Sequence, residues 1–487
     1  MTVVVAIHAL ACTLLVVWGL HRAWQLVDVA RRARSKAPAP LSRTPHVTVQ
    51  LPLYNERTVC ARAVDAVCAQ RYPRDALSVQ ILDDSTDETG AIVAERIAHW
   101  RARGVSVEHV RRADRAGFKA GALAHGLARA EGELIAVFDA DFAPDDDFLA
   151  RIVPSFDDAS IAMVQARWEH ENRAANALTR AQAACLDAHF TVEHAGRSAR
   201  GRFFNFNGTA GVWRRSAIER AGGWDARTLT EDLDLSLRAY LDGARFVYRD
   251  DVAARAELPA DVNAFLGQQH RWAKGSMQTA RLLLPEVWRS PRSLVEKVDL
   301  TLKLTQNVAF LWLAVVACTL PFVAQESAGR PALSLTVAET LALVGATVPV
   351  VLHLLWSARA RGRSIASAIV DVPLAFALGA ALSIPNAFAV VAGLLDVGDR
   401  TFHRTPKRGA AGAAPYAMRA SVVVVVSLAL AVLHAGTAAL TLARGEVRFA
   451  PVLLAFGAGL SWLSIGALGE VLSRRAALSI DRATSRA

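Results

Sequence analysis

Cysteine is scarce in this sequence: the 487 residues include five, and no two of them form a Cys-x-x-Cys pair. An odd and scattered set excludes a disulfide scaffold and argues against a cysteine-rich zinc site. The glycine-rich phosphate loops are also missing, because the sequence has neither a Walker A motif nor Gly-x-Gly-x-x-Gly. A bound nucleotide would therefore have to be held by something other than a glycine cradle.

Charged residues are absent from several long apolar stretches. Asp, Glu, Lys and Arg do not occur at 1–21, 304–325, 420–443 or 449–469, and 331–358 contains only Glu339. Each stretch is long enough for a helix that spans a bilayer, which needs about 20 apolar residues. With 53% hydrophobic residues, the chain is expected to be an integral membrane protein, neither disordered nor one soluble domain.

Basic residues flank these stretches and predict the topology. Residues 1–21 are expected to form an uncleaved anchor with the N-terminus outside, because the basic linker 22–44 follows the apolar run. The basic tail at 471–487 is expected in the cytoplasm. The net charge of +10 is thereby assigned to the membrane flanks rather than to a nucleic-acid partner.

The segment 364–395 is the ambiguous one. A single crossing here would place the basic loop 396–419 and the tail 471–487 outside, against the positive-inside rule. Pro373 and Pro385 also divide the segment into halves too short to span alone. We expect about five spans and one re-entrant or interfacial hairpin, with a sixth full span as the alternative.

Residues 45–290 have ordinary globular composition and precede a predicted transmembrane region at 291–470. Strands are predicted at 47–51, 79–82, 105–110 and 134–138, and helices from 56, at 91–102 and at 119–130. This alternation predicts an α/β domain with a mostly parallel sheet and helices on both faces. Ligands of such sheets bind beyond the carboxyl ends of the strands.

Acidic residues follow two of these predicted strands. Asp83 and Asp84 come after the second strand, and Asp139 and Asp141 after the fourth. Two carboxylates spaced i, i+2 can hold one divalent cation, which bridges and neutralises a diphosphate. An Asp-x-Asp pair also occurs by chance, but its place after a buried strand favours a nucleotide site.

Two further clusters could carry chemistry. Thr230-Glu231-Asp232 opens a helical pattern, where carboxylates also serve as simple helix caps. Gln268 to Trp272 places an Arg that can clamp a phosphate beside a Trp that can stack on a sugar. The alternative for this second cluster is a helix surface packed against a membrane neighbour.

Histidines give no metal motif. His189 and Glu193-His194 are one residue too far apart for His-x-x-Glu-His, and side chains five residues apart do not share a face of an α-helix. We therefore expect no zinc site here.

The order of these motifs resembles that of membrane-embedded family 2 glycosyltransferases. The matching motifs lie at 50–56, 83–87, 117–123, 139–141, 206–209, 230–232, 268–272 and 402–407. The likeness covers 50–409 and is strongest to bacterial relatives of the cellulose-synthase-like mannan and glucan synthases, with cellulose and hyaluronan synthases more distant. It implies a GT-A fold and a gating loop within 396–419.

The resemblance also implies a role for each matching residue. Asp232 would be the catalytic base, and Asp139 and Asp141 would hold Mg²⁺ or Mn²⁺. The nucleotide donor would be bound by Asp83, Asp84, Lys119, Asp139, Gln268, Arg271, Thr405 and Lys407. The acceptor would be bound by Trp272, Glu231, Asn207 and Gly208.

The implied reaction is inverting, metal-dependent transfer of a hexose from UDP-glucose or GDP-mannose to a growing β-linked polysaccharide, coupled to export. A single base without a motif for a second nucleophile agrees with one in-line displacement. The alternatives are transfer of one sugar to a membrane lipid and a non-enzymatic nucleotide-sugar transporter or sensor. The expected location is a bacterial inner or plasma membrane with a cytoplasmic catalytic domain. Expected partners are the donor, a glycan or lipid acceptor and the bilayer, without nucleic acid.

Overall fold

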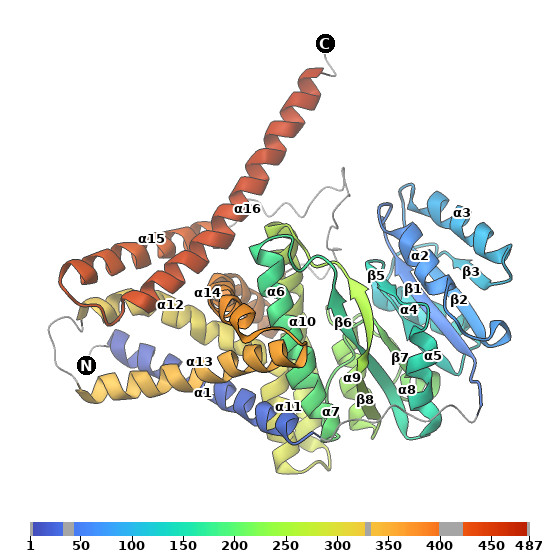
Figure 1. The fold of residues 1–487 in the computed structure, drawn as a ribbon, viewed down its shortest axis with the longest axis horizontal. Helices are drawn as coiled ribbons and strands as arrows, with labels where there is room; N and C mark the ends of the chain where they lie inside the picture. Colours follow the sequence, from blue (N-terminus) through green and yellow to red (C-terminus); the bar gives the residue numbers. More distant parts are fainter. Residues whose placement is uncertain (1–2, 33–42, 327–332, 399–421, 485–487) are drawn as a thin grey trace.

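The computed structural model describes residues 3–32, 43–326, 333–398 and 422–484. A domain built on one sheet occupies one side of the molecule, and a group of long apolar helices occupies the other (Figure 1). The C-terminal end of the last helix projects away from both (Figure 1).

The sheet has eight strands in the order β3-β2-β1-β4-β7-β6-β8-β5. They are β1 (Val47–Leu53), β2 (Leu77–Asp83), β3 (Ser106–Val110), β4 (Leu134–Val137), β5 (Phe142–Pro144), β6 (Ile161–His170), β7 (Gly211–Arg214) and β8 (Arg245–Ala256). The first four strands are parallel, as predicted. Strand β7 is antiparallel to both of its neighbours and β5 is antiparallel to β8, so the whole sheet is mixed.

Helices cover both faces of the parallel half, which confirms the predicted layering. Leu134 and Ala136 of β4 pack into one apolar core together with α2 (Cys60–Cys68) and α3 (Thr89–Arg101). The alternate residues of β4 pack on the other face with α4 (Phe118–Arg129). A central parallel strand buried on both faces needs such a continuous apolar run.

The remaining helices of this domain follow the sheet order. They are α5 (Phe148–Ile152), α6 (Ala177–Ala188), α7 (Ala195–Ala199), α8 (Arg215–Arg220), α9 (Glu231–Leu241), α10 (Val262–Arg289) and α11 (Leu294–Leu304). Three short 3₁₀ helices, η1 (Arg74–Ala76), η2 (Val153–Asp157) and η4 (Gln306–Val308), and a π-helix, η3 (His189–His194), complete it.

Six helices in the described part of the chain are long and apolar enough to cross a membrane. They are α1 (Val3–Ala30), α12 (Ala309–Glu326), α13 (Leu333–Ala360), α14 (Ile365–Leu395), α15 (Val422–Ala443) and α16 (Ala450–Thr484). Each of the five predicted spans falls in one of them. Helices α1 and α16 continue well beyond the stretches without charge.

The segment predicted to be a hairpin is one unbroken helix, α14, so its division at Pro373 and Pro385 is wrong. Proline is tolerated in apolar helices because neighbouring helices and local adjustments satisfy the freed carbonyl groups. Helix α14 packs against α6 and α10 of the sheet domain and also against α12 and α16.

Both ends of α14 are bonded to the sheet domain. Near the start, the buried Asp371 accepts from Arg180 Nε at 2.6 Å and from Arg173 Nη2 at 2.9 Å. Directly after the end, Asp396 accepts from Arg281 Nη2 of α10 at 2.6 Å. These ion pairs fix α14 alongside the catalytic half of the molecule.

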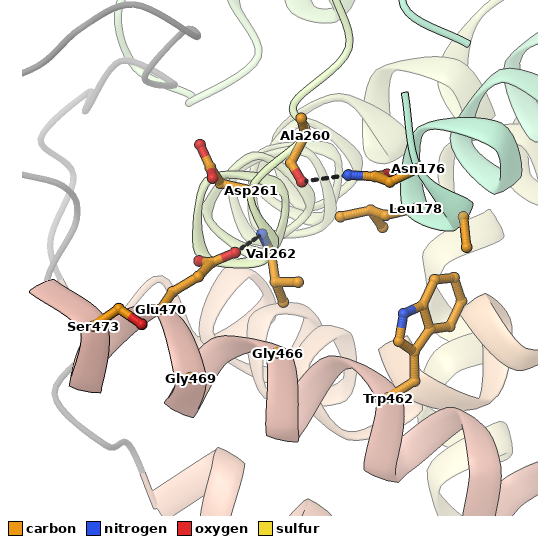
Figure 2. Close-up of a pocket in the computed structure, with 11 residues that line it drawn as sticks. Asn176, Leu178, Ala260, Asp261, Val262, Trp462, Gly466, Gly469, Glu470 and Ser473 are labelled. Atoms are coloured by element: carbon orange, nitrogen blue, oxygen red, sulfur yellow. Dashed lines mark hydrogen bonds between the residues drawn. The ribbon is translucent and has the colours of Figure 1, made fainter. Parts of the chain in front are cut away.

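Helix α10 is capped by a residue far away in the sequence. The Asp261 side chain makes no cap hydrogen bond, and Glu470 of α16 supplies the carboxylate instead. Its oxygens accept from Val262 N at 2.6 Å and from Asn263 N at 3.0 Å. Figure 2 shows Glu470 reaching from α16 to the first turn of α10, beside an open pocket of about 610 Å³.

Candidate active site

The loop after β4 brings a lysine and a carboxylate together. Lys119, in the first turn of α4, places its Nζ 2.6 Å from Asp139 Oδ1 and donates to Gly208 O at 2.9 Å. Burial raises the pKa of Asp139, although the Lys119 ammonium opposes that shift. The ammonium group therefore provides fixed positive charge at the sheet edge where ligands bind.

Asp232 lies in the first turn of α9, across Gly208 from Lys119. Its Oδ1 accepts from Leu233 N at 2.8 Å. Burial, together with the neighbouring Glu231, raises the pKa of Asp232 to about 7. A carboxyl group with a pKa near neutrality is suited to general-base catalysis, because it is both available and basic enough to take a proton. Glu231 itself is buried, with Oε1 3.7 Å from Lys119 Nζ.

Gly208 separates the base from the lysine. Its φ is +78°, and a Cβ built there would lie 3.0 Å from Asp232 Oδ2 and 3.3 Å from Lys119 Nζ. Both the backbone conformation and the space thus favour glycine. Next to it, Thr209 Oγ1 accepts from Asp139 N at 2.9 Å. The loop that contains Asn207 and Gly208 therefore sits between the two catalytic candidates.

Asp139 and Asp141 are the candidate metal ligands. In the described residues, no group of three or more His, Cys, Asp or Glu side chains could hold an ion by itself. Two carboxylates at a strand end fit a cation whose remaining ligands come from a diphosphate and water. These residues are thus suited to a metal that binds together with the donor.

Asp83 and Asp84 lie at the same sheet edge and are held by neighbouring residues. Asp83 Oδ2 is 2.9 Å from His109 Nε2, and its Oδ1 accepts from Ser85 N at 2.9 Å. Burial would raise the pKa of Asp83, but these hydrogen bonds outweigh it and lower the pKa. Arg112 donates to both carboxylate oxygens of Asp84, at 3.0 and 2.5 Å.

The predicted cluster on α10 opens onto a cavity of about 900 Å³. Gln268 and Trp272 line it, as do Asp232 and Asn207, so the structure brings four predicted site residues to one space. Arg271 is buried in α10. The cavity continues between α1, α12, α13, α14 and α16. Thr405 and Lys407 lie outside the described residues.

Sequence reasoning missed a charged cluster on the wall of this cavity. Glu193 Oε2 is 3.0 Å from His189 Nδ1, and its Oε1 accepts a hydrogen bond from Lys303 of α11. The ring centroids of His189 and His194 lie 4.3 Å apart. The argument that five residues separate two side chains was wrong here, because η3 is a π-helix, in which i and i+5 meet. No periodicity in the sequence signals such a segment.

Comparisons with known proteins agree with this site. Residues 45–275 match the family described as Glycosyltransferase like family 2. Glucomannan 4-beta-mannosyltransferase 1 of Oryza sativa subsp. japonica is 46% identical over 53% of this chain and 50% of its own. Glucomannan 4-beta-mannosyltransferase 2 of Arabidopsis thaliana is 44% identical over 52% of this chain and 48% of its own. The chain thus spans about half the length of these relatives.

A solved structure has the same fold. It is a mannosyltransferase from Pyrobaculum calidifontis in complex with GDP-Man and Mn²⁺, with a TM-score of 0.56 and 22% sequence identity. The match covers 76% of this chain and 98% of that chain. Together with the family match, this likeness shows the GT-A glycosyltransferase fold.

Proposed function

We propose that this protein is an inverting glycosyltransferase that transfers a hexose from a nucleotide sugar to a hydroxyl group of a β-linked glycan. The observation that carries the proposal is the position of Asp232. This carboxyl group, with a pKa of about 7, faces the cavity that Gln268 and Trp272 line. On the other side of Gly208, Lys119 and Asp139 offer charge for a diphosphate.

The chemistry is a single displacement. Asp232 accepts the proton of the acceptor hydroxyl group while that oxygen attacks the anomeric carbon of the donor sugar. The bond from that carbon to the diphosphate oxygen breaks, and the nucleoside diphosphate leaves. Asp139 and Asp141 would hold a divalent cation that neutralises charge on the leaving group, and Lys119 adds its own positive charge. One displacement inverts the anomeric configuration.

We favour GDP-mannose as the donor. The support is the 46% identity of this region to a glucomannan mannosyltransferase and the shared fold with a protein that binds GDP-Man. UDP-glucose is the second candidate, since the carboxylates at the strand ends and Lys119 address the diphosphate that both donors share.

The cavity supports a polymeric product that leaves through the membrane helices. Beyond Asp232 its wall alternates aromatic rings with polar groups, among them Trp18, Trp168, Gln182 and Asn307. Rings and hydrogen-bonding groups together suit a sugar chain, because a sugar presents apolar faces and hydroxyl edges. We infer that the acceptor chain lies in this cavity and is exported along it.

We also infer that α14 lies at the membrane interface on the catalytic side. A helix that crossed the bilayer would have one end on the far side, yet Asp371 and Asp396 both bond to the sheet domain. Single cysteines at Ile365 and Val397, which are 46% and 51% exposed, test this inference in a cysteine-free background. An impermeant thiol reagent should label both positions from the same side of sealed vesicles.

A radiolabelled-donor assay tests the function. Purified protein is given labelled GDP-mannose or UDP-glucose with Mg²⁺ or Mn²⁺, and the products are separated by solubility. We expect ethanol-insoluble polymer from GDP-mannose, whereas a lipid-linked single sugar would partition into chloroform–methanol and contradict the polymer proposal. Asp232→Asn should fold and lose transfer, and wild-type rates in that variant would contradict the role of the base.

A further inference from the structure

We propose that Gln278 is a positioning residue that holds the loop before the catalytic base and ties it to the end of α14 through Asp396. The inference rests on the proposed function, because it assigns the base role to Asp232. Neither the motifs in the sequence nor the family match at 45–275 points to Gln278, which lies beyond the Gln268 to Trp272 cluster.

Gln278 uses both ends of its amide. Its Oε1 accepts from Leu229 N at 3.1 Å, and its Nε2 donates to Asp396 Oδ1 at 3.1 Å. The side chain is only 1% exposed. Because a buried backbone N–H group that loses its partner is costly, this glutamine is needed where it stands. The amide therefore connects the base loop to the residue that ends α14.

The same face of α10 presses on the base loop at two more points. A Cβ on Gly275 would lie 2.6 Å from Thr230 Cγ2, so the two backbones approach closely. Thr279 Oγ1 is 3.2 Å from Thr230 Oγ1. Positions 275, 278 and 279 are spaced i, i+3 and i+4 and share one helix face. Leu229 and Thr230 therefore rest on this face two to three residues before Asp232.

Asp396 is itself fixed. It adopts a left-handed φ of +54°, which Asp tolerates better than most residues, and it pairs with Arg281 of α10 at 2.6 Å. Asp396 follows α14 directly, so a shift of α14 along α10 would pull on Gln278. The base loop and the helix beside the cavity are thereby linked through one side chain.

The expected effect is on turnover rather than on donor binding. The donor site at Asp139 and Lys119 belongs to β4 and α4, whereas Gln278 acts on the loop that places Asp232. A misplacement of about 1 Å in a reacting group can cost on the order of 100-fold in rate. We expect Gln278→Leu to lower kcat by at least about tenfold and to change the donor KM by less than about threefold.

Gln70 provides a matched control. It is also 1% exposed, its Oε1 accepts from Leu149 N at 3.1 Å, and its Nε2 donates to Asp145 O at 2.9 Å. It has the same chemistry and burial but no contact with the base loop. Gln70→Leu should lower the melting temperature about as much as Gln278→Leu and leave kcat of the folded enzyme unchanged.

An exchange of partners gives a second test that does not depend on Gln278→Leu folding. Gln278→Glu keeps an acceptor for Leu229 N but sets a carboxylate against Asp396, and kcat should fall. Adding Asp396→Asn to Gln278→Glu restores a donor opposite the carboxylate, and we expect kcat to recover at least about tenfold of the loss.

The outcomes separate this inference from the proposed function. Normal kcat in Gln278→Leu, a matching loss of kcat in Gln70→Leu, or no recovery in the double variant would overturn the positioning role. Asp232→Asn, assayed in parallel, should be inactive. Wild-type transfer by Asp232→Asn would instead overturn the base assignment, and with it the proposal for Gln278.

Discussion

Lys119 Nζ lies 2.6 Å from Asp139 Oδ1, at the sheet edge where a nucleoside diphosphate would bind. The ammonium group opposes the rise in the pKa of Asp139 that burial causes. It is therefore both a partner of the candidate metal ligand and a charge for the phosphates. This pair connects the sequence motif on α4 to the motif after β4, and removing it has a defined consequence.

Lys119→Met should weaken donor binding. Without the ammonium, burial raises the pKa of Asp139 further, so less carboxylate is available at neutral pH, and the diphosphate also loses a cation. We expect the donor KM to rise about tenfold and kcat to fall as well. Initial-rate kinetics measure both. Lys297→Met serves as control, because Lys297 bonds to Trp288 O, away from the site; equal kinetics in the two variants would contradict the role of Lys119.

The rate of transfer should follow the ionisation of Asp232. Its pKa is about 7, and only the deprotonated form can accept the proton of the acceptor. We expect kcat to rise as pH increases through about 7 and then to level off. Measuring kcat at saturating donor across the neutral range tests this, and a rate that is independent of pH through neutrality would argue against Asp232 as the base.

Asp232→Asn should make the protein more stable at alkaline pH while it abolishes transfer. A carboxyl group with a raised pKa in the folded state stabilises the fold most when protonated, and this contribution is lost as pH rises through about 7. The amide does not ionise. We expect a gain of about 1 kcal/mol or more in the free energy of unfolding near pH 8, and none near pH 4. Denaturation at the two pH values decides, and a loss of stability near pH 8 would contradict the burial of the charge.

Gly208→Ala should abolish transfer through a steric effect. An added Cβ would lie 3.0 Å from Asp232 Oδ2, in addition to the strain of a φ of +78°. Gly104→Ala isolates the strain, because Gly104 has a φ of +75° and no atom within 4 Å of the added Cβ. Both variants should lose about 1 kcal/mol of stability. Transfer should fall at least about 100-fold in Gly208→Ala alone, and similar activities would show that the Cβ contact is harmless.

Glu470→Ala should loosen the start of α10. The carboxylate accepts from Val262 N, Asn263 N and Asn263 Nδ2, all within 3.0 Å. Loss of a helix cap costs about 1–2 kcal/mol, and Glu470→Gln, which keeps an acceptor, should cost less. Thermal unfolding measures both. Ser473→Ala, at the next turn of α16 and exposed, is the control, and an equal effect there would contradict the capping role.

Much of the fold followed from local patterns. The four parallel strands and the three helices between them were predicted within a few residues, because buried parallel strands need continuous apolar runs. The carboxylates after β2 and β4 came to one edge because parallel strands end on the same side. Asp232, Gln268 and Trp272 were predicted by resemblance, and the structure placed all three on one cavity.

Other features depended on contacts between distant residues. Pro373 and Pro385 predicted a break, yet α14 continues through both, held at its ends by Arg180 and Arg281. The π-helix at η3 also escaped prediction, since a single extra residue in a helix leaves no periodic signal.

The sequence by itself determined the alternation of strands and helices, the apolar helices and the residue types of the site, because each depends on neighbours within a few positions. Only the tertiary structure decided which side chains complete the site. Glu470 caps α10 from 208 positions away, and Gln278 joins Leu229 to Asp396 across 49 and 118 positions. Such contacts form when packed elements approach in space, and no local pattern specifies them.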